Sequence, residues 1–310
     1  MELNPQFQQV QVFRAANMDE QAIAEPGDYE ACRRIMRDAS KNYSFASRFL
    51  PADRLRHVEA LYALMRVGDD RVDVGYQGFA SPLAAIEDWE QAYWLAFERG
   101  TSPEPVMRAY LNTAIECGIP CETMSAYFRA MKEDLTVTRF ATFADLMHYM
   151  DGSAIPVGRA MTHILGVRRP YSLKQALPGA DSLSVAMQLS NFWRDIGYDW
   201  SIGRVYLPQE DMDRFEVSEA EIAAGQITSR FIDLLEFEFE RTEHYYAGAE
   251  RSVAMLETGR WAVMSGLEIY RAILPGIRRN RYNVFTRRAG AGTARKFGLA
   301  ARAFLRTVGT

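Results

Sequence analysis

The chain has 310 residues, of which 48% are hydrophobic and 25% charged, and its formal net charge at pH 7 is −4. This composition is typical of a globular protein with a large core, and it excludes collagen-like, low-complexity and wholly disordered chains. A dedicated nucleic-acid-binding protein carries a strong basic excess, so nucleic acid is excluded as a main partner as well.

Residues 1–28 are predicted to form an N-terminal arm outside the folded part. They lack the basic start and apolar core of a signal peptide. No stretch of the chain approaches the roughly 18 consecutive apolar residues that a membrane-spanning helix needs. The cysteines, Cys32, Cys117 and Cys121, are too few for a disulfide framework. We therefore expect a cytoplasmic protein that does not cross a membrane.

Residues 29–310 have apolar residues at helical spacing, whereas alternating β-branched runs are almost absent. This pattern predicts an all-α protein of about ten helices. The predicted helices span residues 29–48, 52–72, 82–99, 105–117, 122–134, 143–165, 182–200, 229–256, 259–281 and 293–306. Gly or Pro residues separate most of them, including the pair Pro178 and Gly179. Because no repeat or shift in composition marks a boundary, residues 29–310 are predicted to form one domain.

The predicted helix 52–72 carries two aspartates on its apolar face. Asp69 and Asp73 continue the helical series of Leu61 and Leu64, so both carboxylates are predicted to point inward. Buried carboxylates one turn apart repel each other unless a cation or a water-filled cavity receives them. Taken alone, such a pair more often lies on a solvated surface.

The predicted helix 182–200 repeats this arrangement. Gln188, Asn191, Asp195 and Asp199 form one polar stripe whose flanks are apolar. Since those flanks are too apolar to face solvent, the stripe is predicted to line an internal cavity. The two stripes together favour two walls of one cavity over two solvated surfaces.

Four inward aspartates indicate a metal and a phosphate ligand. Hard carboxylate oxygens suit Mg²⁺, which keeps several waters and takes further ligands from substrate phosphates. The implied ligand is a diphosphate, and nearby arginines would complete its charge balance. The candidate arginines are Arg66, Arg71, Arg194 and Arg204.

Five ordered segments carry the remaining motifs. They are residues 40–51, 66–73, 149–158, 188–199 and 203–208. Together they resemble the squalene and phytoene synthases, a family that joins two prenyl diphosphates head to head. Head-to-tail prenyl elongases and terpene cyclases also carry aspartate-rich helices but lack the pattern of the last two segments. The resemblance implies the all-α isoprenoid-synthase fold, a single helical domain around a central cavity.

The resemblance also implies roles for the matching residues. Mg²⁺, or Mn²⁺ in its place, would be bound by Asp69, Asp73, Asn191, Asp195 and Asp199. The substrates would contact Ser40, Asn42, Tyr43, Arg66, Val157, Gly158, Gln188, Asn191, Arg194, Arg204 and Tyr206. Arg66 and Arg194 would hold phosphates, and Tyr149 would stand near the reacting carbons. The tyrosines are equally well explained as core aromatics with a hydrogen-bonded hydroxyl.

The implied reaction ionises one prenyl diphosphate, forms a cyclopropyl diphosphate with the second, and ionises again to give a hydrocarbon. Arg194 and the segment 152–154 favour a phytoene synthase acting on geranylgeranyl diphosphate, for which NADPH is not expected. The lack of a Gly-x-Gly-x-x-Gly turn does not decide NADPH use. Asn42 with Tyr43, and the segments 191–193 and 153–159, resemble the bacterial hydroxysqualene-forming branch. The alternative is therefore a C30 enzyme that makes squalene, dehydrosqualene, presqualene diphosphate or hydroxysqualene from farnesyl diphosphate.

Three other classes remain as alternatives. A head-to-tail prenyl elongase and a terpene cyclase would share the aspartate-rich helices. A non-catalytic assembly factor of the same fold is disfavoured, because such a protein would be expected to have lost a metal-binding aspartate.

The C-terminal segment 287–306 is basic and amphipathic. It would either dock on the core or rest on an anionic bilayer, at the inner face of the membrane, where a lipophilic substrate and product partition. Downstream lipid-modifying enzymes would then be partners.

Overall fold

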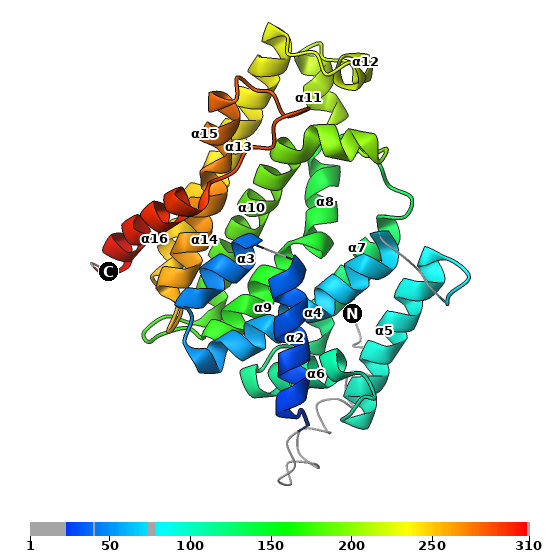
Figure 1. The fold of residues 1–310 in the computed structure, drawn as a ribbon, viewed down its shortest axis with the longest axis vertical. Coiled ribbons are helices and arrows are strands. Elements are labelled where there is room, and N and C mark those ends of the chain that lie inside the picture. The colour runs from blue at the N-terminus through cyan, green and yellow to red at the C-terminus, as the bar shows by residue number, and fades with distance from the viewer. Residues whose placement is uncertain (1–22, 40, 74–77, 309–310) are drawn as a thin grey trace. The chain divides into compact units, whose positions relative to one another are not determined.

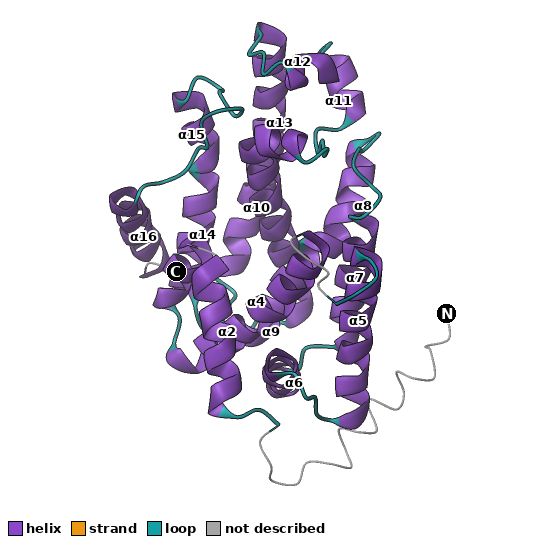
Figure 2. Ribbon diagram, turned by 45° about the vertical axis from the view of Figure 1, so that its right-hand side comes forward, coloured by secondary structure: helices purple, strands orange, loops and turns teal. Residues whose placement is uncertain are grey.

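The computed structural model describes residues 23–39, 41–73 and 78–308, except for the side chains of residues 41–43 and 73. Within these ranges the chain forms α-helices and short 3-10 helices, and no β-strand (Figures 1 and 2). Val167 and Leu256 form an isolated antiparallel bridge. The predicted all-α fold class is therefore confirmed.

The chain divides into two compact units, each of which has its own set of packed helices. The first comprises the described residues up to Lys41 together with Ala52–Glu122, and the second comprises Asn42–Pro51 and Thr123 to the end of the described chain. The single domain predicted for residues 29–310 stays a prediction.

The first unit is built on α2 (Pro26–Ala39), α4 (Ala52–Asp73), α5 (Pro82–Arg99) and α6 (Pro105–Cys117). Helix α4 packs against the other three. Local sequence defines α5 at both ends, because Ser81 accepts a hydrogen bond from the Ala84 amide and Gly100 ends the helix with a positive φ of 70°. The Trp89 indole of α5 donates to the Leu64 carbonyl of α4 at 3.1 Å, which fixes how these two helices meet.

The second unit contains the remaining elements. In chain order they are α3 (Lys41–Ala46, which begins one residue before the unit), η1 (Ser47–Phe49), η2 (Cys121–Met124, which enters it), α7 (Ser125–Glu133), α8 (Phe143–Ser153), α9 (Ile155–Leu165), α10 (Leu173–Ser201), α11 (Gln209–Arg214), α12 (Glu219–Ala223), α13 (Ser229–Val253), α14 (Arg260–Arg271), α15 (Ile273–Arg279) and α16 (Thr293–Val308). Helix α10 is central, since it packs against α8, α9 and α12 to α15.

The close packing of α9 on α10 requires a glycine. A Cβ atom at Gly158 would collide with the Ser184 hydroxyl and would lie 2.9 Å from the Ala180 carbonyl oxygen. Glycine therefore lets the two helices approach. The predicted substrate contact of Gly158 is a separate matter and stays a prediction.

Several predicted helices are divided in the structure, so the described residues hold more helices than the ten expected. The segment 29–48 becomes α2, α3 and η1, and 143–165 becomes α8 and α9. The second division falls at Ala154, directly before the first turn of α9, where Pro156 cannot donate a backbone hydrogen bond. Likewise, 259–281 divides at Ala272, three residues before Pro275.

The break predicted at Pro178 and Gly179 is wrong. Helix α10 begins earlier, because Ser172 and Gln175 form a capping box, and it continues through Pro178. Helices α11 and α12 were also missing from the prediction, since segments of six and five residues show little periodicity. The Ser218 and Glu221 capping box that starts α12 is a signal that the sequence does carry.

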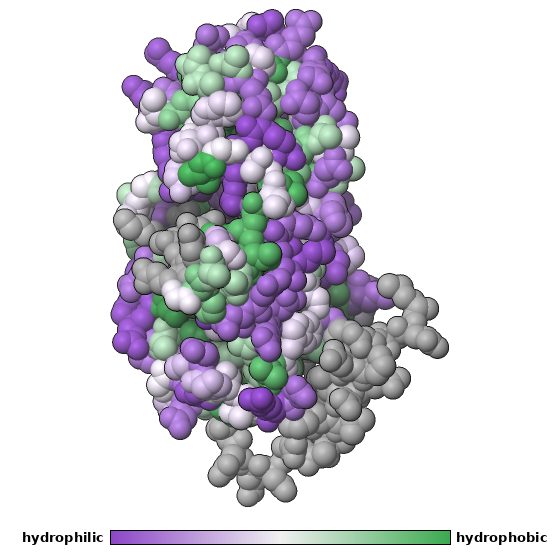
Figure 3. Space-filling view, turned by 90° about the vertical axis from the view of Figure 1, so that its right-hand side faces the viewer, coloured by the Kyte–Doolittle hydropathy of each residue, from purple (hydrophilic) through white to green (hydrophobic). Residues whose placement is uncertain are grey.

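All three cysteines are free thiols. Among the described helices, none has both the length and the apolar character that crossing a membrane requires. The face drawn in Figure 3 is mostly hydrophilic, and its hydrophobic residues form small, separated patches.

Candidate active site

The carboxyl end of α10 places two aspartates next to a buried aromatic surface. Phe192, Trp193 and Ile196 are buried and anchor this part of the helix in the core of the second unit. Asp195 and Asp199 follow the same helix one turn apart. Both carboxylates are therefore held by a rigid, packed element.

Asp195 is bound by two arginines. Arg194 donates to its two carboxylate oxygens at 2.9 and 2.5 Å, and Arg288 donates to the same two oxygens at 2.8 and 2.9 Å. Burial of Asp195 raises its pKa, but the hydrogen bonds from Arg194 and Arg288 outweigh burial and hold the pKa below its ordinary value. Asp195 is therefore a firmly ionised carboxylate.

Arg288 reaches Asp195 because the chain passes very close to α10. A Cβ atom at Gly197 would lie 2.6 Å from the Phe285 Cα and 3.0 Å from the Val284 carbonyl oxygen. Only glycine leaves room for this backbone contact. The side chain of Arg288 is 72% exposed, so its guanidinium is accessible to a ligand.

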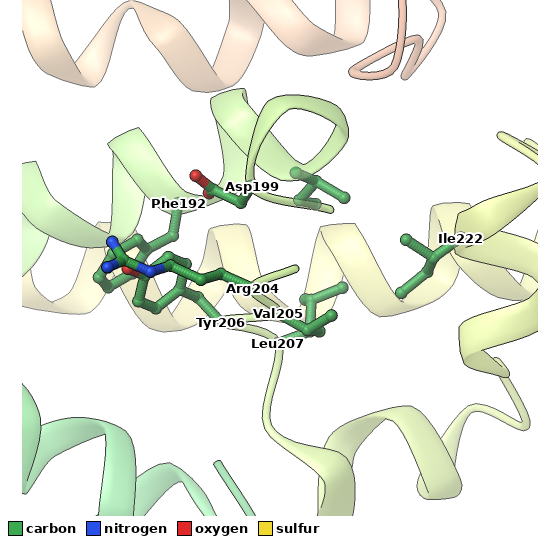
Figure 4. Close-up of a pocket in the computed structure, with 8 residues that line it drawn as sticks. Phe192, Asp199, Arg204, Val205, Tyr206, Leu207 and Ile222 are labelled. Atoms are coloured by element: carbon green, nitrogen blue, oxygen red, sulfur yellow. The ribbon is translucent and has the colours of Figure 1, made fainter. Parts of the chain in front are cut away.

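The pKa of Asp199 is shifted in the opposite direction from that of Asp195. Burial and repulsion from Asp195 raise its pKa to about 7, against the attraction of Arg204 and other arginines. The carboxylate lines a small hollow. Figure 4 shows Asp199, Arg204 and Phe192 on one side of this hollow and Ile222 on the other. A cation bound at Asp199 would restore full ionisation.

An aromatic cluster adjoins the two aspartates. The rings of Tyr206 and Phe192 are stacked with centroids 4.0 Å apart, and Phe140 stacks on Tyr206 at 5.7 Å. The Tyr149 ring lies 5.9 Å from that of Tyr206. Burial raises the pKa of Tyr206 to about 12 and also raises the pKa of Tyr149, so both hydroxyls are neutral near pH 7.

Asp134, at the end of α7, belongs to this site although the sequence analysis did not identify it. Its carboxylate lies 3.9 Å from Arg204, and its negative charge, after burial and Tyr206, contributes to the raised pKa of Tyr149. Arg204 also donates to the backbone carbonyl of Asp134 at 3.2 Å. Asp134 thus pairs with Arg204, one of the predicted site residues.

The first unit places its predicted residues on α4. Asp69 is partly buried there, and Arg66 forms an i,i+4 ion pair with Asp70 at 2.5 Å. Arg71 packs over the Trp89 ring at 4.7 Å and pairs with Asp88 at 2.6 Å. Arg71, one of the candidate diphosphate arginines, therefore joins α4 to α5, and its role toward a diphosphate stays a prediction.

The other predicted residues are placed as follows. Gln188 and Asn191 are half-buried on α10, and Val157 is half-buried on α9. Ser40 lies outside the described residues. Asn42 and Tyr43 are on α3 and Asp73 is the last residue of α4, but their side chains lie outside the described part of the chain.

The donor set fits a metal that takes part of its ligands from a substrate. Within the described residues, no three His, Cys, Asp or Glu side chains converge to form a complete protein cage. Asp195 and Asp199 instead offer hard oxygens from one face of a helix, which suits Mg²⁺ completed by phosphate oxygens and water. The raised pKa of Asp199 marks a half-buried carboxylate whose neighbouring arginines do not offset burial and the repulsion of Asp195.

The two site residues that were not predicted from the sequence lie far from α10 along the chain. Asp134 and Arg288 are joined to the site only by folding, and Arg288 lies 93 residues from Asp195. In the sequence, Arg288 is one member of a basic C-terminal segment and Asp134 ends a helix, so neither carries a local signal of this role.

Comparison with known proteins gives a consistent result. The chain matches the family model for squalene/phytoene synthase over residues 36–295. It is 31% identical to a 15-cis-phytoene synthase of Synechocystis, covering 90% of this chain and 85% of the relative, and 28% identical to chloroplastic phytoene synthase 1 of Arabidopsis thaliana, covering 90% and 67%.

Two solved structures resemble the fold. A dehydrosqualene synthase crystallised with a ligand has a TM-score of 0.82 at 26% identity and covers 98% of this chain and 100% of its own. A squalene synthase from Alicyclobacillus acidocaldarius has a TM-score of 0.73 at 30% identity, covering 83% and 95%. The predicted isoprenoid-synthase fold is thereby confirmed.

Proposed function

Because this chain belongs to the squalene/phytoene synthase family, we propose that it joins two molecules of geranylgeranyl diphosphate head to head and forms phytoene. The observation that carries the proposal is the carboxyl end of α10, where two aspartates, three arginines and a cluster of aromatic rings lie together. Relatives named as phytoene synthases support the C40 product, and the dehydrosqualene and squalene synthases among the similar structures make the C30 branch the alternative.

The charged residues would promote loss of diphosphate. Mg²⁺ would be bound by Asp69, Asp73, Asn191, Asp195 and Asp199 and would supply positive charge to the leaving group. The guanidinium groups of the site would add planar forks that match phosphate oxygens. The guanidinium groups of Arg194 and Arg288 donate hydrogen bonds to Asp195, so a bound diphosphate would share these donors with that carboxylate.

The aromatic residues would protect and stabilise the allylic cation. The faces of Phe192, Tyr149 and Tyr206 carry partial negative charge, and their packing excludes water that would otherwise trap the cation. The second prenyl double bond would attack this cation to give a cyclopropyl diphosphate. A second ionisation, rearrangement and proton loss would then give the hydrocarbon.

The product assay tests the proposal directly. Purified protein is incubated with Mg²⁺ and either geranylgeranyl or farnesyl diphosphate, with and without NADPH, and the extracted lipid is identified by mass spectrometry. A C40 triene from the longer substrate without NADPH is the expected result. A C30 product from the shorter substrate would favour the alternative branch, and no product from either would contradict the proposal.

The metal assignment has its own test. Asp69→Asn and Asp195→Asn should each reduce turnover at least about a hundredfold, because each removes charge that neutralises the leaving group. Circular dichroism should show unchanged helix content in both variants. Lys174→Ala, at an exposed position on α10, is the matched control and should retain wild-type turnover. Near-wild-type rates in either aspartate variant would refute the assignment.

We further propose that α16 contacts the anionic inner surface of the membrane. One face of α16 packs against α14 of the same unit, where the Trp261 indole donates to the Ala300 carbonyl at 2.8 Å and Arg306 pairs with Glu268 at 2.5 Å. The exposed face carries Phe297, Leu305 and Val308, of which Leu305 is 75% exposed. Exposed Arg295 and Arg302 on the same helix supply charge complementary to anionic lipid.

Vesicle flotation distinguishes this contact from simple docking. The protein should float with vesicles of phosphatidylglycerol and phosphatidylcholine but not with phosphatidylcholine alone. Leu305→Ser should weaken flotation, whereas Leu83→Ser, at an exposed leucine of α5, should not. Equal flotation of wild type and both variants would contradict a role for α16.

A further inference from the structure

We propose that Arg139 is a positioning residue that keeps Arg204 in place beside the hollow by fixing the backbone of the segment 203–208. The inference rests on the proposed function, in which the guanidinium groups of the site bind phosphate oxygens. It adds to that function a residue outside the five segments on which the resemblance to the family rests.

The guanidinium of Arg139 binds acceptors from three parts of the chain. Its Nη1 donates to the carbonyls of Thr138 at 2.9 Å and Gly203 at 2.6 Å. Its Nε and Nη2 donate to the two carboxylate oxygens of Glu219 at 2.5 and 3.0 Å. The same group lies over the Trp200 ring, 5.6 Å from its centroid. Because the guanidinium is a rigid, planar fork, four simultaneous hydrogen bonds fix these acceptors relative to one another.

The segment that follows α10 is bound by this group on both sides of Arg204. Gly203 has a positive φ of 81°, and its carbonyl lies beyond the last turn of α10, where the helix supplies no backbone donor. Arg139 supplies one. The Val205 amide donates to the Thr138 carbonyl at 2.9 Å, and Arg139 binds the same oxygen. Arg139 therefore fixes the backbone directly before and directly after Arg204.

Arg139 also joins the two sides of the hollow. Arg204 lies on one side, and Ile222 of α12 lies on the other (Figure 4). Glu219, which accepts from Arg139, is the first residue of α12. Gly203, which accepts from the same guanidinium, directly precedes Arg204. One side chain thus sets the spacing between the two sides.

The position of Arg204 determines what its charge can reach. Its guanidinium donates to the Asp134 carbonyl at 3.2 Å and lines the hollow together with Asp199. A diphosphate held near the aspartates would need this guanidinium at hydrogen-bond distance. A displacement of about 1 Å in such a group can slow a reaction about a hundredfold. A residue that fixes the backbone of Arg204 therefore affects turnover without touching the substrate.

A double-mutant cycle tests whether Arg139 acts through Arg204. Arg139→Gln should lower kcat/KM about tenfold, because the backbone on both sides of Arg204 loses a donor. Arg139→Lys keeps the charge but lacks the fork, so it should recover only part of this loss. In the R204Q background, Arg139→Gln should change kcat/KM less than about twofold. A full tenfold loss in that background would show that Arg139 acts elsewhere, and the proposal would be wrong.

Arg278→Gln is the matched control. Arg278 likewise donates to both oxygens of a partly exposed carboxylate, that of Glu236, at 2.7 and 2.5 Å. Ion pairs of such exposure add little to overall stability, so Arg139→Gln and Arg278→Gln should have similar midpoints of thermal unfolding. Only Arg139→Gln should lower kcat/KM. Equal losses of kcat/KM in the two variants would contradict a specific role for Arg139.

Hydrogen exchange separates failure of this inference from failure of the proposed function. The amides of Arg204 and Val205 are both hydrogen-bonded, and they should exchange faster in Arg139→Gln than in wild type, while amides of α13 should be unchanged. The comparison needs no substrate, so it holds whether or not the wild type makes phytoene or R204Q retains turnover. Equal exchange of the segment 203–208 in both proteins would overturn the inference even in an active enzyme.

Discussion

At the scale of single residues, Glu238 shows how the second unit tolerates a buried acid. Its side chain is fully buried on α13 and accepts from Arg241 at 2.9 and 3.0 Å, while the same guanidinium donates to Asp211 at 2.8 Å. One arginine cannot neutralise two carboxylates. Burial, together with the proximity of Asp211, raises the pKa of Glu238 to about 8 despite Arg241.

This pKa predicts the pH dependence of stability. Between about pH 4 and pH 8 the folded protein keeps a proton on Glu238 that the unfolded chain releases, so the free energy of unfolding falls as pH rises and levels off above pH 8. Glu238→Gln imitates the neutral acid and should remove up to about 1.4 kcal/mol per pH unit of that slope. Urea unfolding at several pH values measures the difference, and equal slopes in both proteins would contradict the assignment.

The site residues that could be predicted are those within one helix. Asp195 and Asp199 share a stripe with Gln188 because helical spacing alone determines which side chains share a face. Asp134 and Arg288 reach the same site through tertiary contacts, and no periodicity reports such contacts. Arg71 is the opposite case. It lies in a segment that resembles the family, and in the structure its side chain packs between α4 and α5.

At the scale of elements, the sequence predicts the ends of a helix correctly where the residues at those ends cap it. The ends of α5 and α6 agree with prediction, because each has a proline in its first turn and a left-handed glycine after its last. The start of α10 and the division between α8 and α9 depend on caps and prolines that compete with strong apolar periodicity. At α10 the capping box prevails over the breaking signal of Pro178, whereas between α8 and α9 the proline signal prevails over periodicity.

The contact between α10 and the segment 284–288 gives a prediction at this scale. Gly197→Ala should force the Phe285 backbone away from α10 and weaken the hold of Arg288 on Asp195. We expect a loss of about 1–3 kcal/mol in the free energy of unfolding and a fall in turnover. Thermal unfolding and the product assay measure the two effects.

Gly266→Ala is the matched control. Gly266 is also within a helix, but a Cβ atom there would have no neighbour within 4 Å. This variant should be as stable as wild type or slightly more stable, because alanine favours a helix over glycine by about 1 kcal/mol. Equal destabilisation by both substitutions would show that backbone crowding at Gly197 is not the cause.

At the scale of the whole molecule, positive charge is supplied almost entirely by arginine. Of the 36 basic residues, only four are lysines. Many of the arginines form two-pronged contacts with carboxylates, as Arg159 does with Asp181 and Arg278 with Glu236. This arrangement suits a chain with an excess of acid that must also bind an anionic ligand.

Ligand binding should therefore stabilise the entire protein. Mg²⁺ together with inorganic diphosphate should raise the midpoint of thermal unfolding by several degrees, because binding to the folded state alone shifts the unfolding equilibrium. Diphosphate with a chelator, and Mg²⁺ alone, should each have a smaller effect. Asp195→Asn should lose the combined increase, and an equal increase in that variant would show binding elsewhere.

The two aspartates near the carboxyl end of α10 also interact with the dipole of that helix. The carbonyl dipoles of a helix sum to a partial negative charge at its carboxyl terminus, where basic side chains are favourable, yet the last turn of α10 has none and carries Asp199 instead. The backbone field and the carboxylates therefore repel one another before any ligand arrives. Part of the affinity for a cation is relief of that repulsion, and Asp199→Asn should make the ligand-free protein more stable while it abolishes turnover.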